Sequence, residues 1–200
     1  MIDYSAENLR YFAKLGAKKV FIEAAKEIVL RHGNAVFLSA DVGRRFGLDA
    51  FTDTDPGRYV DVGISEQAML GIAAGYAAEG FLPYAAAYAP FVTARVLDQV
   101  RILCGAMRTK MVIVGADAGF SAADLGPALT SLSDIANMRA IPNMTVIEPA
   151  DAAETVKALV AAAEIDGPTF VRVVGGPNQE MLHEKEYDFT VGRADVAREG

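Results

Sequence analysis

One carboxylate in this sequence lies where a carboxylate is costly to place. Glu66 stands in the segment 58–80, RYVDVGISEQAMLGIAAGYAAEG, and the residues after it are apolar on every side of a helix. Such a helix is normally buried, and a buried carboxylate is unfavourable unless something pairs with it. Ser65 could cap the helix, and a first-turn acid would gain from the helix dipole. That explains an exposed acid, whereas a buried one indicates a carboxylate held ready for a ligand group.

Several familiar kinds of active site have no counterpart in the sequence. It contains no GxxxxGK[ST] phosphate loop and no GxGxxG dinucleotide fingerprint. With two histidines, His32 and His183, and the single Cys104, a zinc site is poorly supported. Cys104 lies in an apolar stretch, where an inert, buried thiol is expected.

The composition is that of an acidic chain with a substantial core. Of 200 residues, 52% are hydrophobic and 22% charged, which favours one α/β domain. The net charge of -7 argues against a nucleic-acid partner, which would need a basic face. Pro83 and Pro90 interrupt the richest apolar run, so no membrane span is expected. The N-terminus lacks the layout of a signal peptide and one cysteine allows no internal disulfide, so we expect a cytoplasmic protein.

Hydrophobic periodicity divides the chain into alternating helices and strands. Gly16 offers a break in the first helix, and Asp151 is suited to cap the last one. We interpret 41–57 and 117–130 as loops and 175–200 as a polar segment. The predicted strands are 35–40, 58–62, 82–88, 111–116, 144–149 and 169–174, and the predicted helices are 6–32, 65–78, 90–104, 131–138 and 152–163.

This alternation predicts both the fold and the place of the site. Short apolar strands separated by helices are typical of a mostly parallel sheet, here six-stranded, with helices on both faces. Functional residues of such sheets collect at the carboxyl ends of the strands. Those ends hold Asp41, the segment 63–66, Phe91 and Asp117.

The predicted helix 65–78 has a second unusual feature. Gly71 and Gly75 stand four residues apart, so one side of the helix would be flat. Another backbone could approach closely there, as at small-residue pairs in membrane helices. A helix of this kind suits a subunit interface.

In these features the sequence resembles the pyrimidine-binding (Pyr) domain of transketolase-like thiamine diphosphate enzymes. Its longest matching stretch is 58–91, with Arg58, a short strand, G-I-S-E, a Gly- and Ala-rich helix, and a Gly-x-x-Pro strand before Phe91. FLSAD (37–41) resembles the family's first strand, and MRAIPNMTVIEPADAAE (138–154) a later segment. The similarity covers roughly residues 18 to 175, with its motifs in the family's order.

The resemblance implies roles for four residues. Glu66 would hydrogen-bond N1′ of the cofactor's aminopyrimidine and favour the imino form that removes the proton from thiazolium C2. Its partner would then be a ligand and not a protein cation. Phe91 matches the aromatic residue that stacks on the pyrimidine, although an ordinary core Phe is the alternative. Asp41 and Ile64 are assigned to the cofactor site as well, and Asp41 could instead cap the segment that follows it.

The resemblance also covers only half of a cofactor site. In the family, a G-D-G…N segment of a separate PP domain holds the diphosphate and its Mg²⁺, and these 200 residues contain no such segment. This implies a PP-domain (α) partner subunit that holds Mg²⁺, in an α2β2 assembly in which Pyr domains also meet. Residues 1–178 are assigned to the Pyr domain, and 179–200 to a tail leading toward a C-terminal domain absent from the sequence.

The substrate side departs most from the family. An Asp-Gly-Pro-Thr-His run of transketolases matches LGPAL (125–129), and no histidine lies between His32 and His183. We therefore expect a less polar or unphosphorylated substrate, or an acyl donor unlike a ketose phosphate. Asp117, Arg139 and Arg172 remain as possible polar contacts, with a strand-end surface charge as the alternative for Arg172.

These features predict the Pyr-domain (β) subunit of a split transketolase-like enzyme that transfers a two-carbon ketol or acyl unit from a 2-keto or ketose substrate. Two alternatives stay open. The chain could be the β-subunit of the first component of a 2-oxo acid dehydrogenase, which shares the G-I-x-E-Q motif. It could also be a non-catalytic Pyr-like subunit that serves assembly.

Overall fold

Six short apolar segments form a single parallel sheet in the computed structural model, which describes residues 2–193 and 196 of the chain. Every pairing is parallel, and the strand order is β2-β1-β3-β4-β6-β5. The strands are β1 (Ala35–Ser39), β2 (Tyr59–Asp61), β3 (Leu82–Tyr88), β4 (Val112–Ala116), β5 (Thr145–Ile147) and β6 (Thr169–Arg172). The fold class predicted from the alternation of strands and helices is confirmed.

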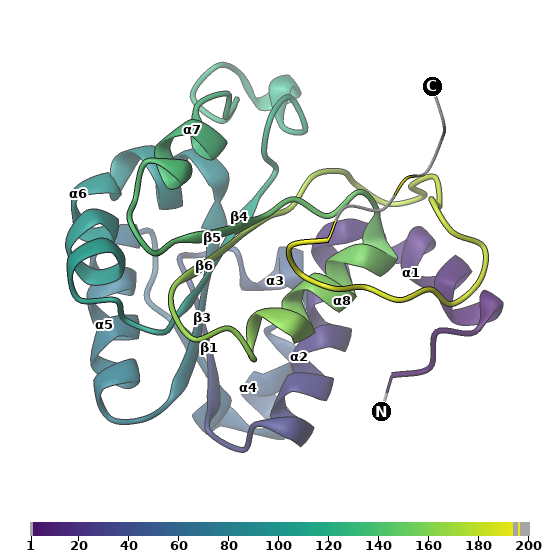
Figure 1. Ribbon diagram of the computed structural model, residues 1–200, viewed down its shortest axis with the longest axis horizontal. Helices are drawn as coiled ribbons and strands as arrows, with labels where there is room; N and C mark the ends of the chain where they lie inside the picture. Colours follow the sequence, from purple (N-terminus) through teal and green to yellow (C-terminus); the bar gives the residue numbers. More distant parts are fainter. Residues whose placement is uncertain (1, 194–195, 197–200) are drawn as a thin grey trace.

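Helices cover both faces of this sheet. On one side lie α1 (Ala6–Lys19), α2 (Phe21–Arg31) and α8 (Ala152–Ala162), and on the other α5 (Glu66–Ala78), α6 (Leu97–Val100) and α7 (Asp134–Arg139) (Figure 1). Asp151 caps α8, as predicted, because its Oδ1 accepts a 2.8 Å hydrogen bond from the Glu154 backbone N–H. Within the described residues, no helix is both long and apolar enough to cross a membrane.

The predicted helix 6–32 is two helices, and the first is kinked. Gly16 inside α1 has φ +78°, a left-handed conformation that glycine adopts without strain. A side chain there is also excluded by space, because an added Cβ would lie 2.2 Å from the Gly176 carbonyl oxygen. The segment after β6 therefore crosses directly over the kink in α1.

Two other segments differ from the sequence expectation. The stretch 41–57 is not only a loop, since it contains the short helices α3 (Gly43–Phe46) and α4 (Ala50–Thr54) and the 3₁₀ turn Pro56–Arg58. The helix predicted over 90–104 is irregular, because π-helical turns at Phe91–Arg95 and Arg101–Ala106 flank α6. Helices of four or five residues carry too little periodicity to detect from sequence, and π turns often mark functional positions.

The predicted tail has no helix or strand in its described part, 179–193 and 196. It folds back on the domain, where the Gln179 side-chain amide accepts from the Ala17 N–H at 3.0 Å and the Leu182 N–H donates to Asp151 Oδ2 at 2.8 Å. Residues 194–195 and 197–200 lie outside the described part of the chain. The domain boundary at 178 stays a prediction.

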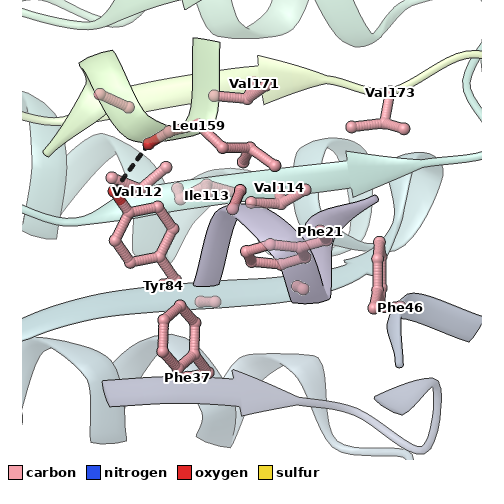
Figure 2. Close-up of a cluster of buried hydrophobic side chains, with 14 of the residues drawn as sticks. Phe21, Phe37, Phe46, Tyr84, Val112, Ile113, Val114, Leu159, Val171 and Val173 are labelled. Carbon is pink, nitrogen blue, oxygen red and sulfur yellow. Dashed lines mark hydrogen bonds between the residues drawn. The ribbon is translucent and has the colours of Figure 1, made fainter. Parts of the chain in front are cut away.

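An aromatic cluster joins the α2 side of the sheet to its central strands. Figure 2 shows Phe21 of α2 meeting Phe37 of β1, Phe46 and Tyr84 of β3, with ring centroids 5.4–6.1 Å apart between Phe21 and the other three. Tyr84 is fully buried, and its hydroxyl donates a 2.9 Å hydrogen bond to the Leu159 carbonyl of α8. Burial raises the pKa of Tyr84, so the hydroxyl remains a donor.

We expect Tyr84→Phe to lower the free energy of unfolding by about 1 kcal/mol, because it leaves the buried Leu159 carbonyl without this donor. The melting temperature should fall by roughly 2–4 °C for a chain of this size. Tyr11→Phe is the matched control, since Tyr11 is 45% exposed. Equal melting temperatures of the Tyr84→Phe variant and the wild type would contradict this role of the hydroxyl.

Candidate functional site

The carboxyl ends of the strands meet at one edge of the sheet, since all pairings are parallel. In register, Ser39 of β1 lies beside Asp61 of β2, and Tyr88 of β3 beside Ala116 of β4. The chain that leaves this edge carries most of the predicted site residues. Those residues are Asp41 after β1, Ile64 and Glu66 after β2, Phe91 after β3, Asp117 after β4 and Arg172 at the end of β6.

Glu66 is the first residue of α5 and is buried, with 3% of its surface exposed. The Ser65 side chain does not cap this helix. Instead, Glu66 Oε2 accepts a 2.9 Å hydrogen bond from Nη1 of Arg95. The expectation that Glu66 has no protein cation as its partner is therefore wrong, because folding brings Arg95 from the segment after β3 to this carboxylate. The contact of Glu66 with a ligand stays a prediction.

Phe91 and Arg95 face the same place. The Arg95 guanidinium carbon lies 3.9 Å from the centroid of the Phe91 ring, a stacking distance. Phe91 is partly buried, and the Tyr88 ring meets it edge-on with centroids 6.1 Å apart. The planar guanidinium of Arg95 is thus held by two residues: Glu66 accepts its hydrogen bond, and Phe91 stacks on its face.

Asp61 organises the two turns that lead to Glu66. Its Oδ1 accepts from the Asp41 N–H at 3.1 Å and from the Gly63 N–H at 2.8 Å, and its Oδ2 accepts from the Ser39 and Tyr59 hydroxyls. Burial opposes the charge of Asp61, but the bond from Gly63 and the other three outweigh it and lower its pKa. One carboxylate thereby ties the end of β1 to the start of the G-I-S-E segment.

Asp41 and Ile64 lie on this edge with exposed side chains. Asp41 has φ +60°, and its backbone N–H is held by Asp61. Ile64 is 75% exposed in the turn before α5. Both side chains are accessible to a ligand, and their cofactor contacts stay predictions.

Asp117 is buried and paired. It is 2% exposed, has φ +53°, and its Oδ1 lies 2.5 Å from Nζ of Lys18 on α1. Removing either partner of such a buried pair would destabilise the fold, because the other charge would be left without compensation. Its proposed contact with substrate stays a prediction.

Three cations line one pocket beside Asp117. A pocket of about 230 Å³ is bounded by Lys18, Lys19 and Arg45 together with Leu15, Gly176 and Pro177. The Arg45 guanidinium also lies over the Tyr88 ring, 5.3 Å from its centroid. Because the Tyr88 ring in turn meets Phe91, side-chain contacts lead from Arg45 of this cationic pocket to Phe91.

Arg172 is not a surface charge at the end of its strand, so that alternative is wrong. Its side chain is 11% exposed, its Nε donates to Asp134 Oδ2 at 2.8 Å, and its Nη1 donates to Glu148. Burial disfavours the charge of Arg172, yet the bond to Asp134 and the charge of Glu148 outweigh it and raise its pKa. The Arg172 guanidinium thus donates hydrogen bonds to two carboxylates, and its contact with a substrate stays a prediction.

Sequence reasoning missed four residues of this edge: Arg95, Asp61, Lys18 and Arg45. A signal existed for Arg95, which follows Phe91 by four residues and so shares its face of a helical turn. Lys18 and Asp117 are 99 residues apart, and no local pattern connects them. Within the described part of the chain, no three His, Cys, Asp or Glu side chains gather as a metal ion would require.

A family profile described as "Transketolase, pyrimidine binding domain" matches residues 13–174. The chain belongs to this family. A solved structure described as a split gene transketolase, inactive beta4 tetramer, superposes on this Pyr domain with a TM-score of 0.81 at 30% identity. That likeness covers 93% of this chain and 59% of the other, and it agrees with the fold described above.

Curated relatives of this Pyr domain include subunits and longer enzymes. The 6-deoxy-6-sulfo-D-fructose transketolase subunit SqwH of Clostridium sp. (strain MSTE9) is 33% identical over 92% of this chain and 56% of its own. The 1-deoxy-D-xylulose-5-phosphate synthase of Synechococcus sp. (strain CC9605) is 35% identical over 91% of this chain and 28% of its own. The chain thus spans about half or less of the length of these relatives.

We expect Asp61→Asn to weaken the Pyr domain in a pH-dependent way. The folded-state pKa of Asp61 lies below its usual value of 3.8, so its contribution is present above that value and is lost as pH falls through the lower, folded-state pKa. The variant should be less stable than wild type at pH 7, and the difference should shrink between pH 4 and pH 2. Urea unfolding at several pH values measures it.

Asp53→Asn, at an exposed acid of α4, is the control and should show no such trend. A difference between Asp61→Asn and wild type that stays constant from pH 7 to pH 2 would contradict the role given to Asp61.

Proposed function

We propose that this chain is the Pyr-domain (β) subunit of a thiamine diphosphate-dependent, transketolase-like enzyme that transfers a two-carbon ketol or acyl unit. The observation that carries the proposal is the pair Glu66 and Phe91, a buried carboxylate and an aromatic face directed at one place on a transketolase-type domain. Family membership makes thiamine diphosphate the cofactor to test.

The arrangement fits an aminopyrimidine. The guanidinium of Arg95 is planar, stacks on Phe91 and donates a hydrogen bond to Glu66. A protonated aminopyrimidine is also planar and presents an N–H donor in its plane. The stacking face of Phe91 and the acceptor oxygen of Glu66, which hold the guanidinium, are therefore the contacts that such a ring needs. Asp41 and Ile64 have exposed side chains on the same edge of the sheet.

Thiamine diphosphate, when bound, supplies a carbon nucleophile and an electron sink for breaking a carbon–carbon bond. The part of Glu66 is to accept a hydrogen bond from ring nitrogen N1′ and so favour its protonation. Burial strengthens this effect, since a charge acts more strongly where water is excluded. The part of Phe91 is to fix the plane of the ring by stacking.

We infer that the other half of the site comes from a partner. These 200 residues carry no G-D-G…N segment, so the residues for the diphosphate and Mg²⁺ would belong to a PP-domain α subunit. Two relatives support a split enzyme, because one is named a transketolase subunit and another is described as a split gene transketolase whose beta4 tetramer is inactive. Such an assembly would be α2β2.

Helix α5 offers a surface for this assembly. Gly71, Ile72 and Gly75 are exposed on its outer side, and an added Cβ at either glycine would meet nothing within 4 Å. The sequence predicts a helix buried on every side, whereas the chain alone buries only the side that faces β3 and β1. Contact with a second Pyr domain would cover the other side.

The cationic pocket supports an anionic substrate, in contrast to the sequence expectation. Because family histidines are missing, the sequence indicates a less polar or unphosphorylated substrate, or an acyl donor unlike a ketose phosphate. Lys18, Lys19 and Arg45, however, line a pocket. Side-chain contacts lead from Arg45 through Tyr88 to Phe91. A substrate with a terminal phosphate or sulfonate would complement the three cations. The names of two relatives specify a sulfo sugar and a sugar phosphate, which supports this substrate class.

The central test combines the chain with a PP-domain partner, thiamine diphosphate and Mg²⁺. Exchange of the thiazolium C2 proton, followed by NMR, should slow by roughly 10²–10⁴-fold in Glu66→Gln, since the variant loses the carboxylate that favours ring protonation. Glu79→Gln, at the other end of α5, is the control. A Glu66→Gln variant that exchanges the C2 proton at the wild-type rate would contradict the catalytic role of Glu66. Transfer of the acyl unit to lipoamide would instead identify the chain as part of a 2-oxo acid dehydrogenase.

The substrate class has its own test. With D-fructose 6-phosphate as donor, Arg45→Gln should raise KM by about tenfold, as expected for one lost charge-assisted hydrogen bond. KM for D-fructose should not change, because it carries no anionic group. Arg44→Gln is the matched control, since Arg44 is the adjacent residue in sequence and its side chain is 94% exposed. An equal change in KM for both ketoses would contradict a phosphate contact.

A further inference from the structure

The Arg95 side chain makes both contacts that the proposed function assigns to the aminopyrimidine. Its guanidinium carbon lies 3.9 Å from the centroid of the Phe91 ring, and its Nη1 lies 2.9 Å from Glu66 Oε2. At 3.9 Å the guanidinium is in van der Waals contact with the ring, which leaves no room for another planar group on that face. Arg95 and the pyrimidine therefore cannot hold this position together.

We propose that Arg95 closes the pyrimidine site and must be displaced when thiamine diphosphate binds. The inference rests on the proposed function of Glu66 and Phe91 and adds a regulation of that site by the chain's own residue. Cofactor binding becomes a competition between two planar hydrogen-bond donors for one carboxylate and one ring face.

The burial of Glu66 gives the closed arrangement a physical reason. A carboxylate that is 3% exposed destabilises the fold unless it is paired. Arg95 supplies that pair across 29 residues of sequence. The subunit can thus fold with the charge of Glu66 paired to Arg95, and the site stays formed before the cofactor and the partner subunit bind.

The position of Arg95 also allows it to leave. Its side chain is 45% exposed, so the guanidinium already borders on water. Arg95 ends the π-helical turn Phe91–Arg95, and Val96 after it departs from helical geometry with φ −107° and ψ 17°. A rotation of the side chain into solvent requires no change in the core.

Closure by Arg95 lowers the apparent affinity for the cofactor by the fraction of molecules that are open. The partner subunit, which would bind the diphosphate and Mg²⁺, supplies the additional binding that opens the site. Arg95 in this way links tight cofactor binding to assembly of the two subunits.

The test measures the Kd of thiamine diphosphate by calorimetry on the chain assembled with its PP-domain partner and Mg²⁺. Arg95→Met keeps the length of the side chain and removes the guanidinium, so Kd should fall by about tenfold. The matched control is Arg101→Met, which removes a 60% exposed guanidinium from the next π-helical turn and should leave Kd unchanged.

A second readout needs no cofactor. In the isolated chain, Arg95→Met should lower the melting temperature by several degrees, because Glu66 loses its partner. Adding Glu66→Gln to Arg95→Met should restore much of that loss. If Arg95→Met does not fold, Arg95→Lys replaces it, since lysine still pairs with Glu66 but cannot stack as a plane, and Kd should fall by about threefold.

An unchanged or higher Kd in these Arg95 variants would overturn the inference, because it would show that Arg95 does not compete with the cofactor. Tight binding by the wild-type complex together with that result would leave the proposed function standing. Failure of the wild-type complex to bind thiamine diphosphate would overturn both.

Discussion

The burial of one carboxylate constrains the rest of the site. Glu66 begins α5 inside the protein, where its charge requires a partner. The approach to it is fixed by Asp61, which holds the turns after β1 and β2, and its partner Arg95 comes from the turn after β3. Three neighbouring strands of the parallel sheet therefore converge on a single charge.

The same principle recurs along the carboxyl edge of the sheet. Asp117 after β4 is paired with Lys18 of α1, and Arg172 at the end of β6 is paired with Asp134 of α7. Each pair joins a strand end to a helix that packs on one face, so the charges position the loops as well as the site. At this edge the buried carboxylates Glu66, Asp117 and Asp134 each pair with a cation, and the apolar core below supplies the framework.

Helix α5 carries both the residue proposed to activate the cofactor and the surface proposed for assembly. Its inner side carries Glu66, Met69 and Leu70 into the protein, and its outer side presents Gly71 and Gly75 to the surface. A helix that is apolar on both sides is incomplete in a single domain. The proposed cofactor site is incomplete in the same sense, since the residues proposed for the pyrimidine lie in these 200 residues and no G-D-G…N segment for the diphosphate does.

The sequence by itself determined the parallel α/β fold and indicated Glu66 and Phe91 as candidate site residues, because short apolar strands, helical periodicity and the G-I-S-E motif are local patterns. The short helices in 41–57, the π turns around α6 and the kink at Gly16 depend on packing and were only partly visible. Tertiary structure alone decided that Arg95 pairs with Glu66 and that Lys18 pairs with Asp117. The physical reason is that a buried charge selects its partner by distance in the folded chain, and residues 29 or 99 positions apart share no local pattern.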